Sequence, residues 1–502
     1  MRQTTSMRKI PFSSLQRIFQ SLRSDCYRLG NENKSFSRFR RKHFFVLPVL
    51  ILPVLILIAA LVLLVSSPVR SEEDPFEKGN ALFSKQRYTE AVAAYTQAIE
   101  KNPKLTEAYV NRGLAWNNLG QPEKAAADFT RALEMKGQSA DVYNYRGLTF
   151  YNKGEPDKAI ADFNKAIELN PRFAEAYYNR ADSWHAKGEH EKAVSDYGKA
   201  VEINPDLADA YHHRGILLHQ EGRLDAALAD FDKALQLKPQ DAEIFLLRGN
   251  VLRDLGRLTK AISDYTQALE INPKLAEAYL NRGYAWDEKE LYDRAIGDYT
   301  AALAVKPEFA EAYNNRGLAW QRKGNLEQAI ADYTKAVEAD EKFSLAYFNR
   351  ANAWREKGNH EQAIADFSKA IASDPAFAEA YLNRGNEWNQ KGEFVRAIKD
   401  YTQAIRLNPD FSEAHFNRGL AHYAESNIDQ AIEDFTRAIG KQPDLAEAYY
   451  YRALSWGKKW ELTGGIPSHI VRALADAKEA ARLSPQEETY RNLVDQLEAE
   501  LR

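Results

Sequence analysis

The sequence contains one cysteine, Cys26, so it can form no intramolecular disulfide and no cysteine-built zinc site. It also lacks a glycine-rich phosphate loop, a strand-helix nucleophile motif and a His-Glu-x-x-His zinc motif. These absences remove the common signatures of enzymes. We therefore expect no catalytic residue, no metal and no cofactor.

What the sequence does contain is a unit that returns every 34 residues, counted here from Glu72 as position 1. Position 20 is alanine in every uninterrupted unit, and position 8 is glycine or alanine, as at Gly113 and Ala181. An aromatic residue follows at position 24, as at Phe129, and another alanine at position 27. The position-20 alanines are Ala91, Ala125, Ala159, Ala193, Ala227, Ala261, Ala295, Ala329, Ala363, Ala397 and Ala431. Small residues at these spacings let two helices approach closely while the aromatic ring fills the groove beside them.

Each unit has the pattern of two helices joined by a short turn. Its apolar residues recur at intervals of three and four, and the turn carries glycine, as at Gly120 and Gly154. A proline at position 32, such as Pro171 or Pro205, ends the second helix before the next unit begins.

With tyrosine at position 4 and tryptophan at position 11 added, the pattern resembles the tetratricopeptide repeat (TPR) family. The resemblance implies an all-α, right-handed superhelical solenoid of about twelve helix-turn-helix repeats over residues 72–487. The last repeat has an insertion near 457–467, which contains Gly464 and Gly465 and is predicted to be a surface loop. Residues 488–502 place Tyr490, Leu493, Leu497 and Leu501 on one face and are predicted to be a capping helix.

The N-terminal part of the chain predicts a membrane anchor. Phe44 to Val65 is an uncharged apolar run of 22 residues, about 33 Å as a helix, enough to span a bilayer. The leader, residues 1–43, carries eleven Lys or Arg against two acids, and acids follow the linker of residues 66–71. The positive-inside rule then keeps the N-terminus in the cytoplasm and places the array on the far side, as in a periplasm. The chain is thus expected to be a single-pass membrane protein, one transmembrane helix preceding the solenoid.

Two other readings of the leader stay open. The first is a cleaved signal peptide that releases a soluble exported array, and the second is an Arg- and Ser-rich transit peptide. The array contains no Asn-x-Ser/Thr glycosylation sequon, which favours a bacterial cytoplasmic membrane. The basic charge is confined to the short leader and the rest of the chain is acidic, so we expect no nucleic-acid partner.

A ladder of asparagines at position 6 is the candidate binding site. In the family this helix lines the concave surface, and a side-chain amide offers both a donor and an acceptor to a peptide backbone. The resemblance therefore implies a groove for extended peptides, with a solvated polar helix face as the alternative. The ladder consists of Asn111, Asn179, Asn281, Asn315, Asn349, Asn383 and Asn417, the last five in consecutive repeats.

Arginine at position 7 and aspartate at position 23 are equally regular. Reflection of an antiparallel helix pair about the proline at position 32 predicts that each aspartate pairs with the arginine of the next repeat. We interpret these pairs as structural, because partly buried Arg-Asp pairs specify packing. The predicted inter-repeat pairs are Asp128–Arg146, Asp162–Arg180, Asp264–Arg282, Asp298–Arg316, Asp332–Arg350, Asp366–Arg384 and Asp400–Arg418.

The sequence therefore predicts a non-enzymatic, membrane-anchored scaffold or adaptor that binds peptide segments or partner proteins. An accessory or regulatory subunit of an envelope enzyme complex is the alternative from another class. His185, His212, His213 and His219 fall in adjacent repeats, but the sequence shows no carboxylate or cysteine that completes a metal site, and solvated histidines are the preferred interpretation.

Overall fold

The computed structural model describes residues 74–501, and every regular element in this range is an α-helix, from α3 to α27. None of these helices combines the length and apolar character needed to cross a bilayer. The predicted spanning segment, residues 44–65, lies outside the described residues, as do the leader and the linker.

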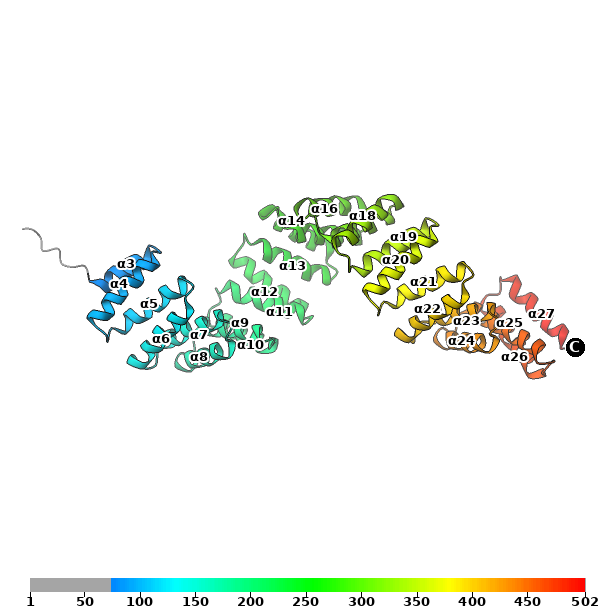
Figure 1. The fold of residues 1–502 in the computed structure, drawn as a ribbon, viewed down its shortest axis with the longest axis horizontal. Coiled ribbons are helices and arrows are strands. Elements are labelled where there is room, and N and C mark those ends of the chain that lie inside the picture. Colours follow the sequence, from blue (N-terminus) through cyan, green and yellow to red (C-terminus); the bar gives the residue numbers. More distant parts are fainter. Residues whose placement is uncertain (1–73, 502) are drawn as a thin grey trace, which may run out of the picture. The chain divides into compact units, whose positions relative to one another are not determined.

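The helices form antiparallel pairs, one pair for each 34-residue repeat (Figure 1). The first helices of the pairs are α3 (Pro75–Ser84), α5 (Thr106–Asn118), α7 (Ala140–Asn152), α9 (Ala174–Ala186), α11 (Ala208–Gln220), α13 (Ala242–Asp254), α15 (Ala276–Glu288), α17 (Ala310–Arg322), α19 (Ser344–Glu356), α21 (Ala378–Gln390), α23 (Ser412–Ala424) and α25 (Ala446–Leu462). The second helices are α4 (Tyr88–Lys101), α6 (Pro122–Lys136), α8 (Pro156–Leu169), α10 (His190–Ile203), α12 (Leu224–Leu237), α14 (Leu258–Ile271), α16 (Tyr292–Val305), α18 (Leu326–Ala339), α20 (His360–Ser373), α22 (Phe394–Leu407), α24 (Ile428–Lys441) and α26 (Pro467–Leu483). One further helix, α27 (Glu488–Glu500), ends the described chain.

The described chain divides into two compact units, residues 74–103 and 104–501. In the first unit, α3 and α4 form one pair, and Tyr95 of α4 donates a hydrogen bond to Asn80 of α3 at 3.0 Å. In the second unit, each second helix packs against the first helix of the following pair, from α5 to α26. The predicted helix-turn-helix array is thus confirmed over the second unit.

Close approach of the two helices explains the small residue at position 8. A Cβ atom added to Gly317 would lie 2.8 Å from Cε1 of Tyr333, and one added to Gly113 would lie 2.7 Å from Cε1 of Phe129. The position-20 alanines are fully buried, as Ala329 shows, and the aromatic rings at position 24 are buried to within 1 %. These residues form the interior of each pair, as the repeat pattern predicted.

The turn inside each pair requires a residue with a left-handed backbone conformation, that is a positive φ, at position 15. Glycine meets this requirement in most repeats, as at Gly324 with φ 79°. Three repeats instead hold Gln86, Glu290 and Ser426 at φ values of 59°, 60° and 61°. A side chain in this conformation costs roughly 1 kcal/mol relative to glycine, so these three turns carry local strain.

The insertion in the last repeat is mostly helical, and the prediction of a surface loop is wrong. α25 and α26 each have 17 residues, against 13 in α5 and 14 in α24, and only residues 463–466 separate them. Lys458 to Leu462 are good helix formers, so the extra residues extend both helices, and Gly464 and Gly465, at φ 72° and 88°, form the turn.

α27 packs on the open side of the last pair. Tyr490, Leu493 and Leu497 are buried, and the two leucines contact the cluster around Ala473 and Ala477 of α26. Leu501 lies beyond the helix end and is 42 % exposed. Three of the four residues assigned to the capping face therefore cover the core of the array.

Candidate functional site

The asparagine ladder lies on the first helices, and all of its members are half-buried. First helices of consecutive pairs approach one another, as α15 approaches α17 and α17 approaches α19. We call the surface formed by positions 6, 9, 12 and 13 of the first helices the first-helix face. On α15 it consists of Asn281, Tyr284, Asp287 and Glu288.

Several ladder amides link one first helix to the preceding one. The Nδ2 group of Asn281 donates to Oδ1 of Asn250 at 2.9 Å, and that of Asn417 donates to Oδ1 of Asn386 at 3.0 Å. Asn349 donates in the same way to Asn314 at 2.9 Å. The fourth such bond runs from Asn179 to Asn144, at 3.0 Å.

The two remaining C-terminal members accept hydrogen bonds through their side-chain oxygens. Oδ1 of Asn315 accepts from Asn314 at 3.2 Å, and Oδ1 of Asn383 accepts from Nη1 of Arg355 at 3.1 Å. Since an amide has two donor hydrogens and two acceptor lone pairs, each retains bonding capacity toward a ligand. The sequence analysis did not identify the hydrogen-bond partners Asn250, Asn314 and Asn386. The feature that could have indicated them is asparagine at position 5 or 9 of the repeat.

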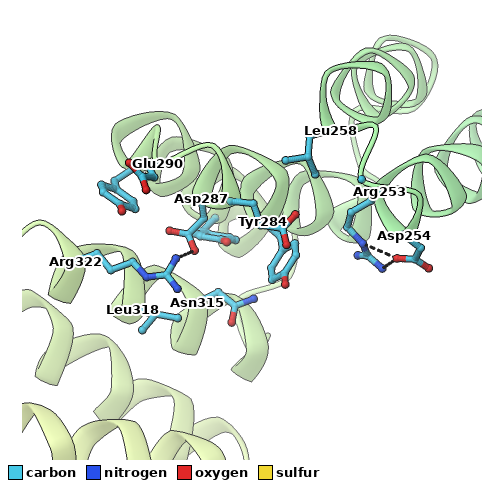
Figure 2. Close-up of a pocket in the computed structure, with 13 residues that line it drawn as sticks. Arg253, Asp254, Leu258, Tyr284, Asp287, Glu290, Asn315, Leu318 and Arg322 are labelled. Carbon is cyan, nitrogen blue, oxygen red and sulfur yellow. Dashed lines mark hydrogen bonds and ion pairs between the residues drawn. The ribbon is translucent and has the colours of Figure 1, made fainter. Parts of the chain in front are cut away.

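A pocket of about 860 Å³ opens on the first-helix face between α13, α15 and α17 (Figure 2). Its lining includes Asn315 of the ladder and the charged residues Arg253, Asp254, Asp287 and Arg322. Arg322 of α17 extends toward Asp287 of α15 and forms an ion pair with it. This pair joins the first helices of two consecutive repeats.

The regular Arg-Asp pairs form within each repeat, so the predicted inter-repeat pairing is wrong. Arg316 binds Asp332 with two parallel hydrogen bonds of 2.7 Å, and the side chains are 16 % and 7 % exposed. The same geometry joins Arg112–Asp128, Arg146–Asp162, Arg180–Asp196, Arg214–Asp230, Arg248–Asp264, Arg282–Asp298, Arg350–Asp366, Arg384–Asp400, Arg418–Asp434 and Arg452–Asp476.

The pairing differs from the prediction because the relevant turn is the one within a repeat, at position 15, and not the one between repeats, at position 32. Positions 7 and 23 are equidistant from the turn at position 15, so the antiparallel pair within one repeat brings them together. The proposed aspartates Asp128, Asp162, Asp264, Asp298, Asp332, Asp366 and Asp400 therefore bind the arginine 16 residues before them, and not the one 18 residues after.

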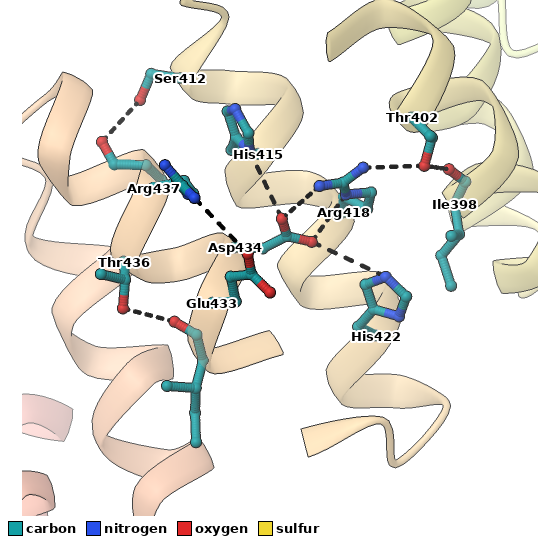
Figure 3. Close-up of polar contacts among 12 residues, drawn as sticks. Ile398, Thr402, Ser412, His415, Arg418, His422, Glu433, Asp434, Thr436 and Arg437 are labelled. Atoms are coloured by element: carbon teal, nitrogen blue, oxygen red, sulfur yellow. Dashed lines mark hydrogen bonds and ion pairs between the residues drawn. The ribbon is translucent and has the colours of Figure 1, made fainter. Parts of the chain in front are cut away.

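The arginine still connects two repeats, through a different residue. Nη1 of Arg418 donates to Oγ1 of Thr402 in the preceding repeat at 3.0 Å, while Nε and Nη2 bind Asp434 (Figure 3). Thr402 in turn donates to the carbonyl oxygen of Ile398 at 2.7 Å. Position 25 supplies this acceptor in most repeats, so one guanidinium joins both helices of its own repeat to the second helix before it.

Five of the ten histidines lie in two adjacent repeats, at 185, 190, 212, 213 and 219. The Tyr178 hydroxyl is 3.1 Å from Nδ1 of His213, and Nε2 of His219 is 2.7 Å from Oδ2 of Asp254. In the described part of the chain, no three His, Cys, Asp or Glu side chains are grouped as metal ligands. His213 and His219 thus contact an aromatic and an acidic neighbour on the first-helix face, whereas His190 begins the second helix α10.

His212 gives this region a predicted pH response. Its Nε2 atom is buried without a partner among the described residues, and burial, followed by the charge of His213, lowers the His212 pKa. Below about pH 6.5, His212 therefore binds a proton more readily in the unfolded chain than in the folded protein. The free energy of unfolding decreases as the pH falls from about 6.5 toward the lower pKa that His212 has in the folded protein. Leucine occupies the same position at Leu246 and Leu280, so we expect His212→Leu to fold and to lose less stability on acidification.

The measurement is the urea midpoint of unfolding at about pH 7.5 and about pH 5.5, on either side of the ordinary histidine pKa. His469→Leu, a change in the last repeat, is the control for loss of any histidine. Equal acid sensitivity of wild type and His212→Leu would contradict the assignment.

The fold and this face define a class, the all-helical repeat proteins whose paired helices stack along the chain. Family models described as "TPR repeat" match residues 79–120, 181–222, 249–286, 351–387 and 385–426. Models described as "Tetratricopeptide repeat" match residues 106–139, 140–173, 163–195, 208–241, 310–343 and 418–456. The chain belongs to the tetratricopeptide repeat family.

Similar proteins match it only in part. It is 52 % identical over 44 residues to Hsp70-Hsp90 organizing protein 1 of Glycine max, a match that covers 9 % of this chain and 8 % of that protein. It is 45 % identical over 53 residues to Hsp70-Hsp90 organizing protein 3 of Arabidopsis thaliana, covering 11 % of this chain and 9 % of the other. The chain thus spans less than a tenth of the length of these relatives.

Two solved structures also match parts of the chain. YrrB, described as a TPR protein with an unusual peptide-binding site, is 29 % identical, with a TM-score of 0.34 over 37 % of this chain and 95 % of that one. Yeast Tom70 is 18 % identical, with a TM-score of 0.35 over 85 % of this chain and 94 % of the other.

Proposed function

We propose that this chain is a non-enzymatic scaffold that binds extended peptide segments of other proteins along the first-helix face. The observation that carries the proposal is the row of half-buried amides at Asn281, Asn315, Asn349, Asn383 and Asn417 on five consecutive first helices. A row with this spacing offers a donor and an acceptor at each helix, which is what an extended main chain presents. Members of the TPR family act generally by binding other proteins, and the relatives named above are called organizing proteins.

The hydrogen bonds between neighbouring helices support this role. Asn250, Asn314 and Asn386 fix the amide orientation of Asn281, Asn349 and Asn417, so these amides are already ordered before a ligand binds. Ordering the side chains in advance reduces the entropy lost on binding. A solvated polar surface has no need of such fixed amides.

We further propose that the array is held at a membrane. The proposal rests on the uncharged run from Phe44 to Val65 and on the basic leader before it. In this arrangement the N-terminus is cytoplasmic and the scaffold faces the far side of the membrane. Fractionation of host cells followed by alkaline carbonate extraction tests it: a chain recovered only in the soluble fraction would contradict anchoring.

The binding proposal predicts that alanine at all five C-terminal ladder positions strongly weakens partner capture. The full-length protein is solubilised from membranes of the native host in mild detergent and purified with its partners, which are identified by mass spectrometry. We expect partners bound by the wild type to fall at least tenfold in the variant, a loss of about 1.4 kcal/mol.

A second variant, Asn314→Leu, tests the ordering of the ladder separately. It removes the hydrogen-bond partner of Asn349 and Asn315 while leaving all five ladder amides, and leucine occupies the same position at Leu280 and Leu382. We expect it to lose fewer partners than the five-alanine variant. If the five-alanine variant is folded by circular dichroism and still retains every partner, the ladder is not the binding surface.

A further inference from the structure

The pocket between α13, α15 and α17 differs from the rest of the first-helix face in its charged residues. Position 12 of α15 is Asp287, whereas the neighbouring first helices hold Arg253 and Gln321 there. The pocket shares Asn315 with the asparagine ladder, so a peptide bound along the ladder passes over it. The residues of this pocket are therefore placed to contact a side chain of that peptide.

Asp287 is a buried carboxylate with half of its hydrogen-bonding capacity unused. Its side chain is 6 % exposed, and one oxygen is paired with Arg322. The other oxygen, Oδ1, has no hydrogen-bond partner among the described residues. A buried carboxylate oxygen without a donor costs free energy, so the site is incomplete without a further donor. Burial accordingly raises the Asp287 pKa, against the opposing charge of Arg322.

The charges around the pocket favour a cation as that donor. Arg253 is paired with Asp254 at 2.9 Å, and Arg322 with Asp287, so both arginines of the pocket are engaged. Glu288 and Glu290 also line it, and neither forms an ion pair with any described residue. These two carboxylates thus remain without a cation. Their negative charge attracts a positive ligand group and repels a negative one.

An aromatic surface lies beside these carboxylates. The Tyr284 side chain is one helical turn before Asp287 and is 40 % exposed, unusually high for a large ring in this array. The guanidinium of Arg253 lies 5.6 Å from the centre of the ring, which shows that the ring accepts a cation. Figure 2 shows Tyr284, Asn315 and Asp287 together on one side of the pocket, with Arg322 extending toward Asp287 from α17.

From this geometry we propose that the pocket binds a basic side chain, arginine or lysine, of the peptide held along the ladder. The proposal rests on the peptide-binding function above. The ligand cation donates to Asp287, lies against Tyr284 and is neutralised by Glu288 and Glu290. Arg322 shares the Asp287 carboxylate, which has two oxygens and accepts more than two hydrogen bonds. Its side chain is 43 % exposed, so it has room to shift as the ligand enters.

The test compares arginine with citrulline, which has the same shape and no charge. Full-length protein in detergent is equilibrated with two pools of short peptides, capped at both ends and randomised among neutral residues, with arginine or citrulline at the centre. Bound peptides are quantified by mass spectrometry. We expect the arginine pool to bind about tenfold more tightly than the citrulline pool to the wild type.

Two variants locate the effect. Asp287→Asn keeps the shape of the side chain, and we expect it to remove the preference for arginine. Asp293→Asn is the matched control, because it makes the same change in net charge in the same repeat, at a side chain that is 85 % exposed and outside the pocket. Asp293→Asn should keep the preference.

The outcomes separate this proposal from the function on which it depends. Equal binding of both pools to the wild type, lost in the five-alanine ladder variant, would overturn the proposed site for a basic side chain and leave the groove proposal intact. An equal loss of the preference for arginine in Asp287→Asn and Asp293→Asn would show that the preference depends only on net charge. This result would also overturn the proposed site. No binding of either pool would count against both proposals.

Discussion

Arg316→Met is expected to lower the free energy of unfolding by about 3–5 kcal/mol, the usual effect of leaving a buried charge without its partner. Arg316 binds both oxygens of Asp332 at 2.7 Å and Oγ1 of Thr300 at 2.9 Å. Methionine fills most of the arginine volume but leaves the Asp332 carboxylate, 5 % exposed, with no countercharge. Urea denaturation followed by circular dichroism measures the change.

The control is the double variant Arg316→Met with Asp332→Leu. Replacing both partners with apolar groups removes the unpaired charge, so much of the lost stability should return. A loss below about 1 kcal/mol in the single variant, the range typical of an exposed ion pair, would show that the pair is not shielded from solvent as the structure indicates.

Phe367→Ala should destabilise the array by about 3–5 kcal/mol, because it removes a large ring from a closely packed interior. Phe367 is fully buried and packs against Ala351 and Ala363, with the ring of Phe348 at 5.6 Å. Each repeat depends on its neighbours for stability, so the loss should extend to the flanking repeats. Hydrogen exchange along α19 to α22 would show this, beside a lowered urea midpoint.

Phe367→Tyr is the matched control. Tyr265 and Tyr401, at the same repeat position, each donate to an asparagine at position 9, Asn250 and Asn386, at 2.9 Å. In this repeat the equivalent atom, Oδ1 of Asn352, is buried without a partner among the described residues. The new hydroxyl should supply that donor, leaving stability unchanged or raised by up to about 1.5 kcal/mol. A large loss in both variants would contradict the packing described.

The repeat pattern predicted the paired helices well because each invariant residue has one physical task. Gly317 is small because the Tyr333 ring leaves no room for a Cβ atom, and Ala329 is small because the helices touch there. Such constraints recur in every repeat, so the sequence shows them many times.

The prediction of inter-repeat Arg-Asp pairs was wrong because the spacing alone fits two antiparallel helix pairs, one within a repeat and one between consecutive repeats. Only the structure distinguishes Asp332 with Arg316 from Asp332 with Arg350. The acidic pocket could not be predicted either. Asp287 and Arg322 are departures from the repeat, 35 residues apart, and their meeting depends on how neighbouring first helices lie side by side.

The central claim is that partners bind the first-helix face, and site-specific photo-cross-linking tests it most directly. A benzophenone amino acid is placed at Gln390, seven residues after Asn383 and so on the same helix face, or at Val395 of α22, which is 70 % exposed. We predict that partner proteins cross-link from Gln390 and not from Val395 in intact membranes. Cross-linking from Val395 alone would contradict the account and assign binding to the second helices.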